Sequence, residues 1–380
     1  MNLGANIMRR RGFAAVLSSL AAIVLQMAIL SVHGQFPEVP SWRNGSNASA
    51  MFILGDSSVD CGNNTLFYPL LHARFSLYPC NGSDATLLPQ LLAVKMGLLS
   101  IPPFYGRKGS LEEILRGLNF GSTQAKIISQ GSWSHQSLNN QLRQVSDTLQ
   151  LLQLQLPQEA ALQFIKSSIF CLSFGKEDYL DLFLHNSSRK KFHSAAQDFA
   201  TILANQVMHA LRFLYESNVR KIICLGIMPL GYTPRMVWQW NKTSTGVSHG
   251  EGCVLEVNKQ VLKFNKMLEQ NIAELNKEFP DAQMVFCDVY KGMIEIIRKP
   301  KFYGFEDTES ACCGLGLNGA TVGCVSMDMA CEQASTHIWW DLLNPTLAVN
   351  SILANAAWSG QPFSSLCRPI TVQKLVSSRV

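Results

Sequence analysis

The sequence predicts an α/β protein in which a central parallel sheet lies between layers of helices. Short apolar runs typical of buried strands alternate with segments that repeat apolar residues at helical spacing. Polar residues do not interrupt the apolar centres of these runs, as expected for strands covered by helices on both faces. Each run also ends in a glycine or a polar cluster, so the sequence places any ligand site beyond the carboxyl ends of the strands.

In chain order, the predicted elements are a strand at 51–54, a strand at 167–173, a helix at 194–216, a strand at 221–226, a helix at 254–279 and a strand at 284–287. Pro280 ends the second of these helices. The chain shows no internal repeat and no linker rich in proline or glycine. We therefore predict one domain at 51–370, followed by a C-terminal tail at 371–380.

The N-terminus has the pattern of a targeting segment. Three arginines at 9–11 precede an apolar stretch at 13–30, which closes on Val32-His33-Gly34, whose last residue is small enough for a signal peptidase. This pattern predicts a signal peptide at 1–34 and a polar lead-in at 35–50. The apolar stretch is long for a signal peptide, so a signal anchor is the alternative.

Two further features predict a secreted glycoprotein. Asn-x-Ser/Thr sequons occur at six positions: Asn44, Asn47, Asn63, Asn81, Asn186 and Asn241. The 11 cysteines all follow the leader, which suits an oxidising compartment.

Seven of the 11 cysteines fall into two groups. Cys171, Cys224 and Cys287 lie in apolar runs and are predicted to be small core residues. Four others, Cys312, Cys313, Cys324 and Cys331, crowd one loop-like region. Because no histidine sits among those four at ligand spacing, we predict a disulfide-stapled loop and no metal site there.

Composition excludes several other classes of protein. The chain is 47% hydrophobic and 16% charged, which is globular and not disordered. Its formal charge of +5 falls to about +2 when the three leader arginines are removed. No basic run is interleaved with aromatic residues, so we expect no nucleic-acid partner.

The first predicted strand leads into Gly55-Asp56-Ser57-Ser58. A serine at a tight turn after a buried strand has its hydroxyl exposed at the carboxyl edge of the sheet. Alone, the pattern also fits an ordinary turn with an aspartate cap. The surrounding motifs distinguish these two interpretations.

An ordered series of motifs resembles the plant GDSL esterase/lipases, a branch of the SGNH hydrolases. The matching segments are Phe52 to Asn64, Gly117 to Ser122, Gly175 to Tyr179, Pro229 to Pro234, Phe302 to Phe305, Ala311 to Gly314 and Trp339 to Thr346. The resemblance implies the three-layer, flavodoxin-like SGNH fold and carboxylesterase or lipase activity that needs no metal or organic cofactor. It also implies an extracellular location in the cell wall or apoplast.

The same resemblance implies roles for individual residues. Ser57 takes the position of the nucleophile, and Asp341 that of the acid that orients the base. Asn344 stands where the family has its histidine base. Thr123 and Gln124 stand where glycine is usual in the backbone part of the oxyanion hole, and Glu177 replaces its asparagine.

Two of these departures bear on catalysis. An amide such as that of Asn344 cannot take the serine proton, and a serine hydroxyl without a base is a poor nucleophile. An ionised carboxylate at Glu177 accepts hydrogen bonds only, so it would repel an oxyanion. Our hypothesis is that Glu177 instead serves as the base for Ser57. His337, four residues before Asp341, is a weaker alternative because we expect it to point away from Ser57.

Two functions follow from these residues. The first is a serine ester hydrolase that forms an acyl-enzyme on Ser57 and acts on a small fatty-acyl or acetylated-glycan ester. The second is a non-catalytic relative that binds a lipid, a glycan or a protein. A structural wall protein would predict repeats or low-complexity tracts, and the sequence has neither.

Overall fold

The computed structural model describes residues 48, 50–60, 87–98, 101–106, 109–129, 131, 136–185, 189–243, 250–324 and 326–378. The predicted signal peptide, nearly all of the lead-in and five of the six sequons lie outside these residues, and the sixth, Asn241, is in a helix. Within the described part of the chain, none of the helices combines the length and the apolarity needed to cross a membrane.

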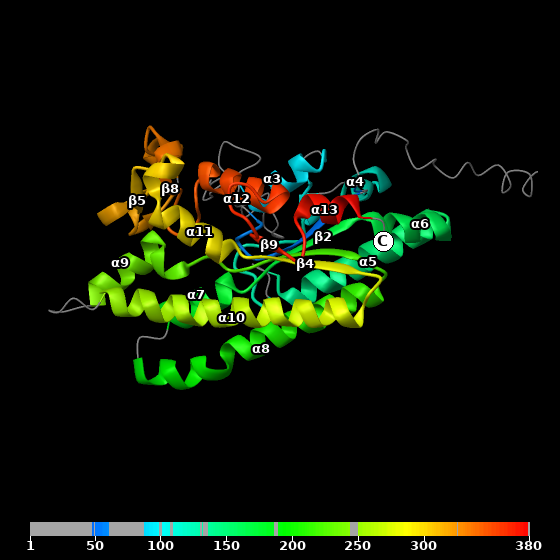
Figure 1. Cartoon of the computed structure of the whole chain (residues 1–380), viewed down its shortest axis with the longest axis horizontal. Helices are drawn as coiled ribbons and strands as arrows, with labels where there is room; N and C mark the ends of the chain where they lie inside the picture. The colour runs from blue at the N-terminus through cyan, green and yellow to red at the C-terminus, as the bar shows by residue number, and fades with distance from the viewer. Residues whose placement is uncertain are drawn as a thin grey trace, which may run out of the picture. The chain divides into compact units, whose positions relative to one another are not determined.

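A five-stranded sheet forms the centre of the domain (Figure 1). Its strands, in spatial order, are β1 (Met51–Gly55), β2 (Ile169–Ser173), β3 (Lys221–Leu225), β4 (Gln283–Cys287) and β9 (Cys367–Arg368). The first four run parallel, and β9 is antiparallel to β4. Every residue of β1, β2 and β3 is buried. The predicted parallel sheet with both faces covered is therefore confirmed.

Helices cover both faces of this sheet. In chain order, the α-helices among the described residues are α3 (Leu88–Lys95), α4 (Leu111–Arg116), α5 (Leu138–Gln155), α6 (Gln158–Ser167), α7 (Lys176–His185), α8 (Arg189–Glu216), α9 (Pro234–Thr243), α10 (Gly250–Glu278), α11 (Val289–Arg298), α12 (Leu347–Ser359) and α13 (Val372–Ser377). Figure 1 shows α8 and α10 on one side of the sheet and α3, α12 and α13 on the other. The two helices predicted from apolar spacing are α8 and α10, and α10 ends just before Pro280.

An irregular segment extends the sheet beyond β1. Ile53 donates its N–H to Leu118 O (2.9 Å), and Phe120 donates its N–H to Ile53 O (2.7 Å). Ser122 donates its N–H to Gly55 O at 3.0 Å. These bonds satisfy the outer edge of β1, which would otherwise leave buried backbone groups unpaired.

The C-terminal residues differ from the tail that the sequence predicts. Residues 372–377 form α13, which buries Val372, Leu375 and Val376 in the core. Their spacing of three and one residues places all three side chains on one helix face. Lys221 adds a polar link, because its Nζ donates to Val376 O at 3.0 Å. The folded domain therefore includes most of the predicted tail.

The cysteine-rich loop is stapled as predicted, by the disulfides Cys312–Cys331 and Cys313–Cys324. It lies with two small sheets, one pairing β5 (Asp307–Ala311) with β8 (His337–Trp339) and one pairing β6 (Gly314–Leu315) with β7 (Val322–Gly323).

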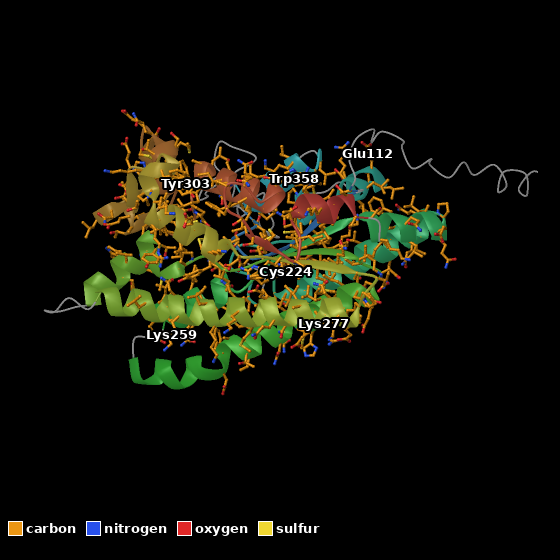
Figure 2. All side chains as sticks on the ribbon, in the orientation of Figure 1. Glu112, Cys224, Lys259, Lys277, Tyr303 and Trp358 are labelled. Carbon is orange, nitrogen blue, oxygen red and sulfur yellow. A yellow bond between two sulfur atoms is a disulfide. The ribbon has the colours of Figure 1, made fainter. Side chains whose placement is uncertain are left out.

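The predictions for the core cysteines are right for two residues and wrong for one. Cys171 and Cys224 are free and buried, and Cys224 lies in the interior of the domain (Figure 2). Cys287 is buried but is bonded to Cys367, so it is not a plain core residue. The sequence did not indicate this bond, because β9 is only two residues long and comes 80 residues later.

Candidate active site

Ser57 follows β1 at the carboxyl edge of the sheet, on the turn that the sequence predicts. The neighbouring Asp56 is fully buried, and its carboxylate accepts the N–H groups of Ser58 and Lys176, both at 2.9 Å. Because Lys176 begins α7, this carboxylate ties the turn after β1 to the helix after β2. A side chain at Gly55 would prevent that approach, since its Cβ would lie 2.4 Å from Ser173 O.

The Ser57 hydroxyl donates a hydrogen bond to Glu177 Oε1. Glu177 lies in the first turn of α7, and β1 and β2 are neighbours in register, so the two side chains meet at one sheet edge. Burial raises the pKa of the Glu177 carboxyl above its usual 4.5, and the Lys176 ammonium partly offsets this effect. The carboxylate of Asp56 adds to the elevation of the pKa.

Because the pKa of Glu177 is raised, we predict that replacing it with glutamine increases the stability of the folded protein in a pH-dependent way. The folded state favours the protonated acid, so its stability falls as pH rises from the usual value through the raised pKa. We expect Glu177→Gln to match the natural protein below pH 4.5 and to have a larger free energy of unfolding at pH 8. A pKa elevation of one unit corresponds to about 1.4 kcal/mol.

Urea unfolding below pH 4.5 and at pH 8 measures this difference in the free energy of unfolding. Asp178, whose pKa burial raises to about 6, also titrates in this range, so the comparison between variants is needed to isolate Glu177. Glu112→Gln, at a glutamate exposed on α4, is the matched control and should show no such gain. Equal stability of Glu177→Gln and natural protein at pH 8 contradicts the prediction.

Asp341 and Asn344 form a buried pair. Asn344 Nδ2 donates to both carboxylate oxygens of Asp341, each at 3.0 Å. Asp341 Oδ1 also accepts the N–H groups of Leu343 (2.9 Å) and Asn344 (2.7 Å). The aspartate therefore orients the amide of Asn344 as it would orient an imidazole.

The other end of the Asn344 amide binds a lysine. Asn344 Oδ1 accepts a hydrogen bond from Lys176 Nζ at 2.7 Å, so Asp341, Asn344 and Lys176 form a continuous chain. Sequence reasoning missed Lys176, whose side chain is only 1% exposed. The available signal was a long cation between Gly175 and Glu177, at a turn predicted to lie at the sheet edge.

The backbone N–H of Thr123, at the predicted oxyanion-hole position, already donates to a hydrogen-bond acceptor. Thr123 donates its N–H (2.8 Å) and its hydroxyl (2.9 Å) to Asp60 Oδ2. Gln124 is exposed and has φ of 64°, a left-handed conformation that glycine adopts without strain. That conformation is a physical reason for a glycine at this turn.

His337 lies in the cysteine-rich part of the domain, on β8. Its Nε2 is 3.7 Å from Asp307 Oδ2, and its Nδ1 is 3.2 Å from Gln333 O. Cys312, Cys331 and His337 are close enough together to be considered as metal ligands. Because the two cysteines are joined in a disulfide, they offer no thiolates to a metal.

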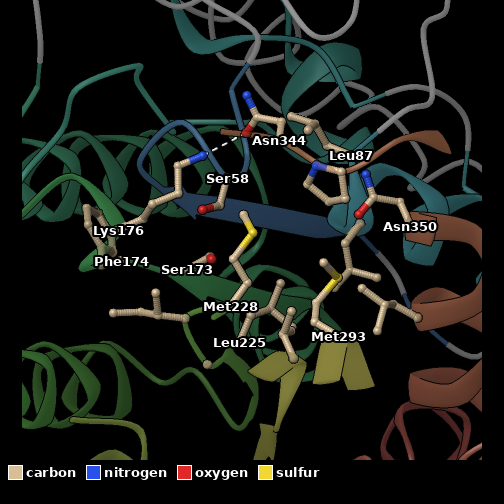
Figure 3. Close-up of a pocket in the computed structure, with 16 residues that line it drawn as sticks. Ser58, Leu87, Ser173, Phe174, Lys176, Leu225, Met228, Met293, Asn344 and Asn350 are labelled. Carbon is tan, nitrogen blue, oxygen red and sulfur yellow. Dashed lines mark hydrogen bonds between the residues drawn. The ribbon is translucent and has the colours of Figure 1, made fainter. Parts of the chain in front are cut away.

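A pocket opens beside this site, beyond the carboxyl ends of β2 and β3 (Figure 3). Ser58, Lys176 and Asn344 contribute polar groups to its wall. Most of the remaining lining is apolar, including Leu225, Met228 and Met293. A largely apolar pocket with a few convergent polar groups is the usual form of a small-molecule site.

A parallel sheet with a serine–carboxylate pair at its carboxyl edge, next to an apolar pocket, defines an α/β protein of the hydrolase type. The chain matches the GDSL-like Lipase/Acylhydrolase family over residues 51–357, which is most of its length. This protein belongs to that family.

Named relatives agree with the assignment. The chain is 31% identical to the GDSL esterase/lipase At1g71250 of Arabidopsis thaliana, over 96% of each chain. It is 28% identical to GDSL esterase/lipase At5g37690 of the same plant, over 84% of this chain and 90% of that one.

Solved structures are more distant. An α/β hydrolase from the metagenome of Lake Arreo, Spain, matches with a TM-score of 0.39 at 13% identity, over 82% of this chain and 95% of that one. An acetyl xylan esterase from Geobacillus stearothermophilus matches with a TM-score of 0.36 at 14% identity, over 82% and 93%.

Proposed function

We propose that this protein is a serine ester hydrolase in which Glu177, in place of a histidine, takes the proton of Ser57. The observation that carries the proposal is the hydrogen bond from the Ser57 hydroxyl to Glu177 Oε1. A nucleophile within hydrogen-bond reach of its base is the basic requirement for activation. Membership of the GDSL family supports the ester as the bond that is cleaved.

The proposed reaction has two stages. Ser57 Oγ attacks the ester carbonyl carbon while its proton passes to the Glu177 carboxylate. The protonated Glu177 then gives that proton to the departing alcohol oxygen, which leaves an acyl group on Ser57. In the second stage water gives a proton to Glu177 and attacks the acyl carbon, and Ser57 recovers its proton when the acid departs.

The raised pKa of Glu177 favours this role. A carboxylate of ordinary pKa is too weak a base to draw a proton from a serine hydroxyl efficiently at neutral pH, and a higher pKa improves the match. The proposed substrates are small fatty-acyl or acetylated-glycan esters. The apolar lining of the pocket suits the acyl part of such a molecule.

We further propose that the protein is secreted and glycosylated. The leader at 1–34 and the six sequons support this proposal. Three disulfides among the described residues add support, because such bonds persist in oxidising compartments.

The second candidate function is a binding protein without turnover. The observation that favours it is the placement of Asn344, whose carbonyl oxygen accepts a hydrogen bond from Lys176 where a histidine would serve Ser57. The two candidates differ in one measurable property, which is the dependence of ester turnover on Ser57.

Hydrolysis of p-nitrophenyl acetate and butyrate tests the proposal on the natural protein, Ser57→Ala and Glu177→Gln. We expect both variants to lose about 100-fold or more, since general base catalysis contributes 10²–10⁴-fold. Glu112→Gln is the matched glutamate control and should retain the natural rate. Circular dichroism verifies that each variant is folded.

If the natural protein is no faster than Ser57→Ala, the hydrolase proposal is wrong and the binding function stands. If Ser57→Ala is inert but Glu177→Gln keeps the natural rate, Ser57 is the nucleophile and the assignment of Glu177 as its base is wrong.

A further inference from the structure

Lys176 is a buried cation whose ammonium forms no direct ion pair among the residues that the structure describes. Its side chain is 1% exposed, and Nζ makes a hydrogen bond to the neutral amide oxygen of Asn344. Among the residues that the structure describes, no aspartate or glutamate forms a direct ion pair with this ammonium, although its charge opposes the rise in the pKa values of the nearby Asp56 and Glu177 carboxyls. An ammonium group has three N–H donors, so two remain for another acceptor.

This cation lies on the wall of the pocket beside Ser57. Figure 3 shows Lys176 and Asn344 at one end of the pocket and Leu225 and Met293 toward the other. Among the described lining residues, Lys176 is the one that carries a charge. The remainder of the wall is mostly aliphatic, thioether and phenyl groups. The pocket therefore combines one positive end with an apolar body.

The nearby carboxyl groups of Asp56, Glu177 and Asp341 do not line this pocket, and each already accepts hydrogen bonds from other groups. The Asp56 carboxylate accepts two backbone N–H groups, and burial raises its pKa. Glu177 accepts the hydrogen bond from Ser57. Asp341 accepts from the Asn344 side chain and from two backbone N–H groups. An occupant of the pocket would thus meet the ammonium before it met any carboxylate.

We infer that this pocket binds an aliphatic monocarboxylate, with the carboxylate on Lys176 Nζ and the hydrocarbon chain against the apolar wall. A charge-assisted hydrogen bond to the ammonium would fix the head of the ligand. Burial of the chain against side chains such as Leu225 and Met228 would supply the apolar contribution. Esters, alcohols and amides of the same length lack the negative charge and would bind more weakly.

This inference goes beyond the proposed hydrolase function and holds whether or not Ser57 turns over an ester. A free acid could come from two sources, namely the medium or the protein's own hydrolysis of an ester. In the second case the pocket would retain the acid product, and accumulating acid would inhibit the enzyme.

Isothermal titration calorimetry tests the site on the mature protein with butanoate, hexanoate and octanoate. Matched neutral ligands are hexanamide and octanamide, and the variants are Lys176→Met and Lys299→Met. Methionine keeps the length of the lysine side chain and removes its charge, while Lys299 is an exposed lysine on the surface. We expect the natural protein to prefer hexanoate to hexanamide by about 10- to 100-fold, the usual effect of a hydrogen bond to a charged group.

Lys176→Met should abolish that preference, and Lys299→Met should retain it. Equal binding of acid and amide by the natural protein overturns the inference, and this comparison needs no variant to fold. A preference for the acid that survives in folded Lys176→Met also overturns it.

Native mass spectrometry of the natural protein and Ser57→Ala distinguishes the two sources of the acid. Free hexanoate should load both proteins. After exposure to p-nitrophenyl hexanoate, hexanoate bound by the natural protein but not by Ser57→Ala is the product of its own hydrolysis. If hydrolysis fails while free hexanoate still binds, the hydrolase proposal is wrong and the binding site stands. If free hexanoate loads neither protein, the site is wrong.

Discussion

Asn344→His alone is expected to leave ester hydrolysis close to the natural rate, whereas Asn344→His combined with Lys176→Ser is expected to raise it about 100-fold or more. The reason is the hydrogen bond from Lys176 Nζ to Asn344 Oδ1 at 2.7 Å. An imidazole at position 344 would donate a hydrogen bond to Asp341 through one ring nitrogen and accept a hydrogen bond from Lys176 at the other. The lone pair required by Ser57 would then be occupied.

The lysine also opposes the charge that such a base acquires. An imidazole that takes the serine proton becomes positive, and an ammonium at hydrogen-bond distance lowers its pKa. Lys176→Ser removes both obstacles, since serine is short and neutral. Adding Glu177→Asn to this pair would also restore an amide donor at the oxyanion position, which is worth about 10²–10³ in turnover in well-studied cases.

The four proteins of this cycle are the natural protein, the two single variants and the double variant, all assayed with p-nitrophenyl butyrate. Lys176→Ser alone should fall far short of the 100-fold gain, because the Asn344 amide cannot take a proton and the change acts only through the pKa of Glu177, which the lysine lowers. The predicted signature is non-additivity, with the gain confined to the double variant. A full gain from Asn344→His alone contradicts the coupling between positions 176 and 344.

The parts of the fold that the sequence predicts are those with strong periodic signals. The strands β1 to β4 contain uninterrupted apolar residues, and α8 and α10 bury one face over many turns. The segment beside β1 was not predicted because its pairing rests on a few backbone bonds between irregular residues. α13 was missed because six residues give little periodic signal outside their packing context.

The same distinction applies to the candidate site, where one contact could be predicted from the sequence and another could not. The meeting of Ser57 with Glu177 follows from the parallel pairing of β1 and β2, which brings the ends of the two strands together. The contact between Lys176 and Asn344 joins residues 168 positions apart, and no local pattern specifies it. A lysine at that position would ordinarily be read as a solvated surface residue. Only the packed structure shows that it is buried against Asn344.

Gly117→Ala is expected to destabilise the protein by several kcal/mol and to lower ester turnover with it. Gly117 ends α4 with φ of 100°, and a Cβ there would lie 1.9 Å from the backbone oxygen of Met51. A collision with backbone cannot be relieved by a change of rotamer. The segment that follows Gly117 would have to leave β1, the strand that positions Ser57.

The chain offers a matched control for the conformational part of this effect. Gly109 also has a positive φ, 80°, but an added Cβ would meet no atom within 4 Å. Gly109→Ala should therefore cost about 1 kcal/mol, the price of an alanine in a left-handed conformation. Gly117→Ala adds the steric clash, and large losses of this kind reach ~4 kcal/mol or more.

Urea unfolding of both variants, followed by p-nitrophenyl butyrate turnover under conditions where each is folded, separates the two contributions. If the steric clash with the Met51 backbone causes the effect, Gly117→Ala loses both stability and ester turnover. Gly109→Ala keeps the natural turnover, because its substitution does not disturb the site. Equal unfolding free energies for the two variants would mean that α4 does not dock its end against β1. The bonds at Ile53 and Gly55 would then be dispensable for presenting Ser57, and the edge of the sheet would be held by its helices instead.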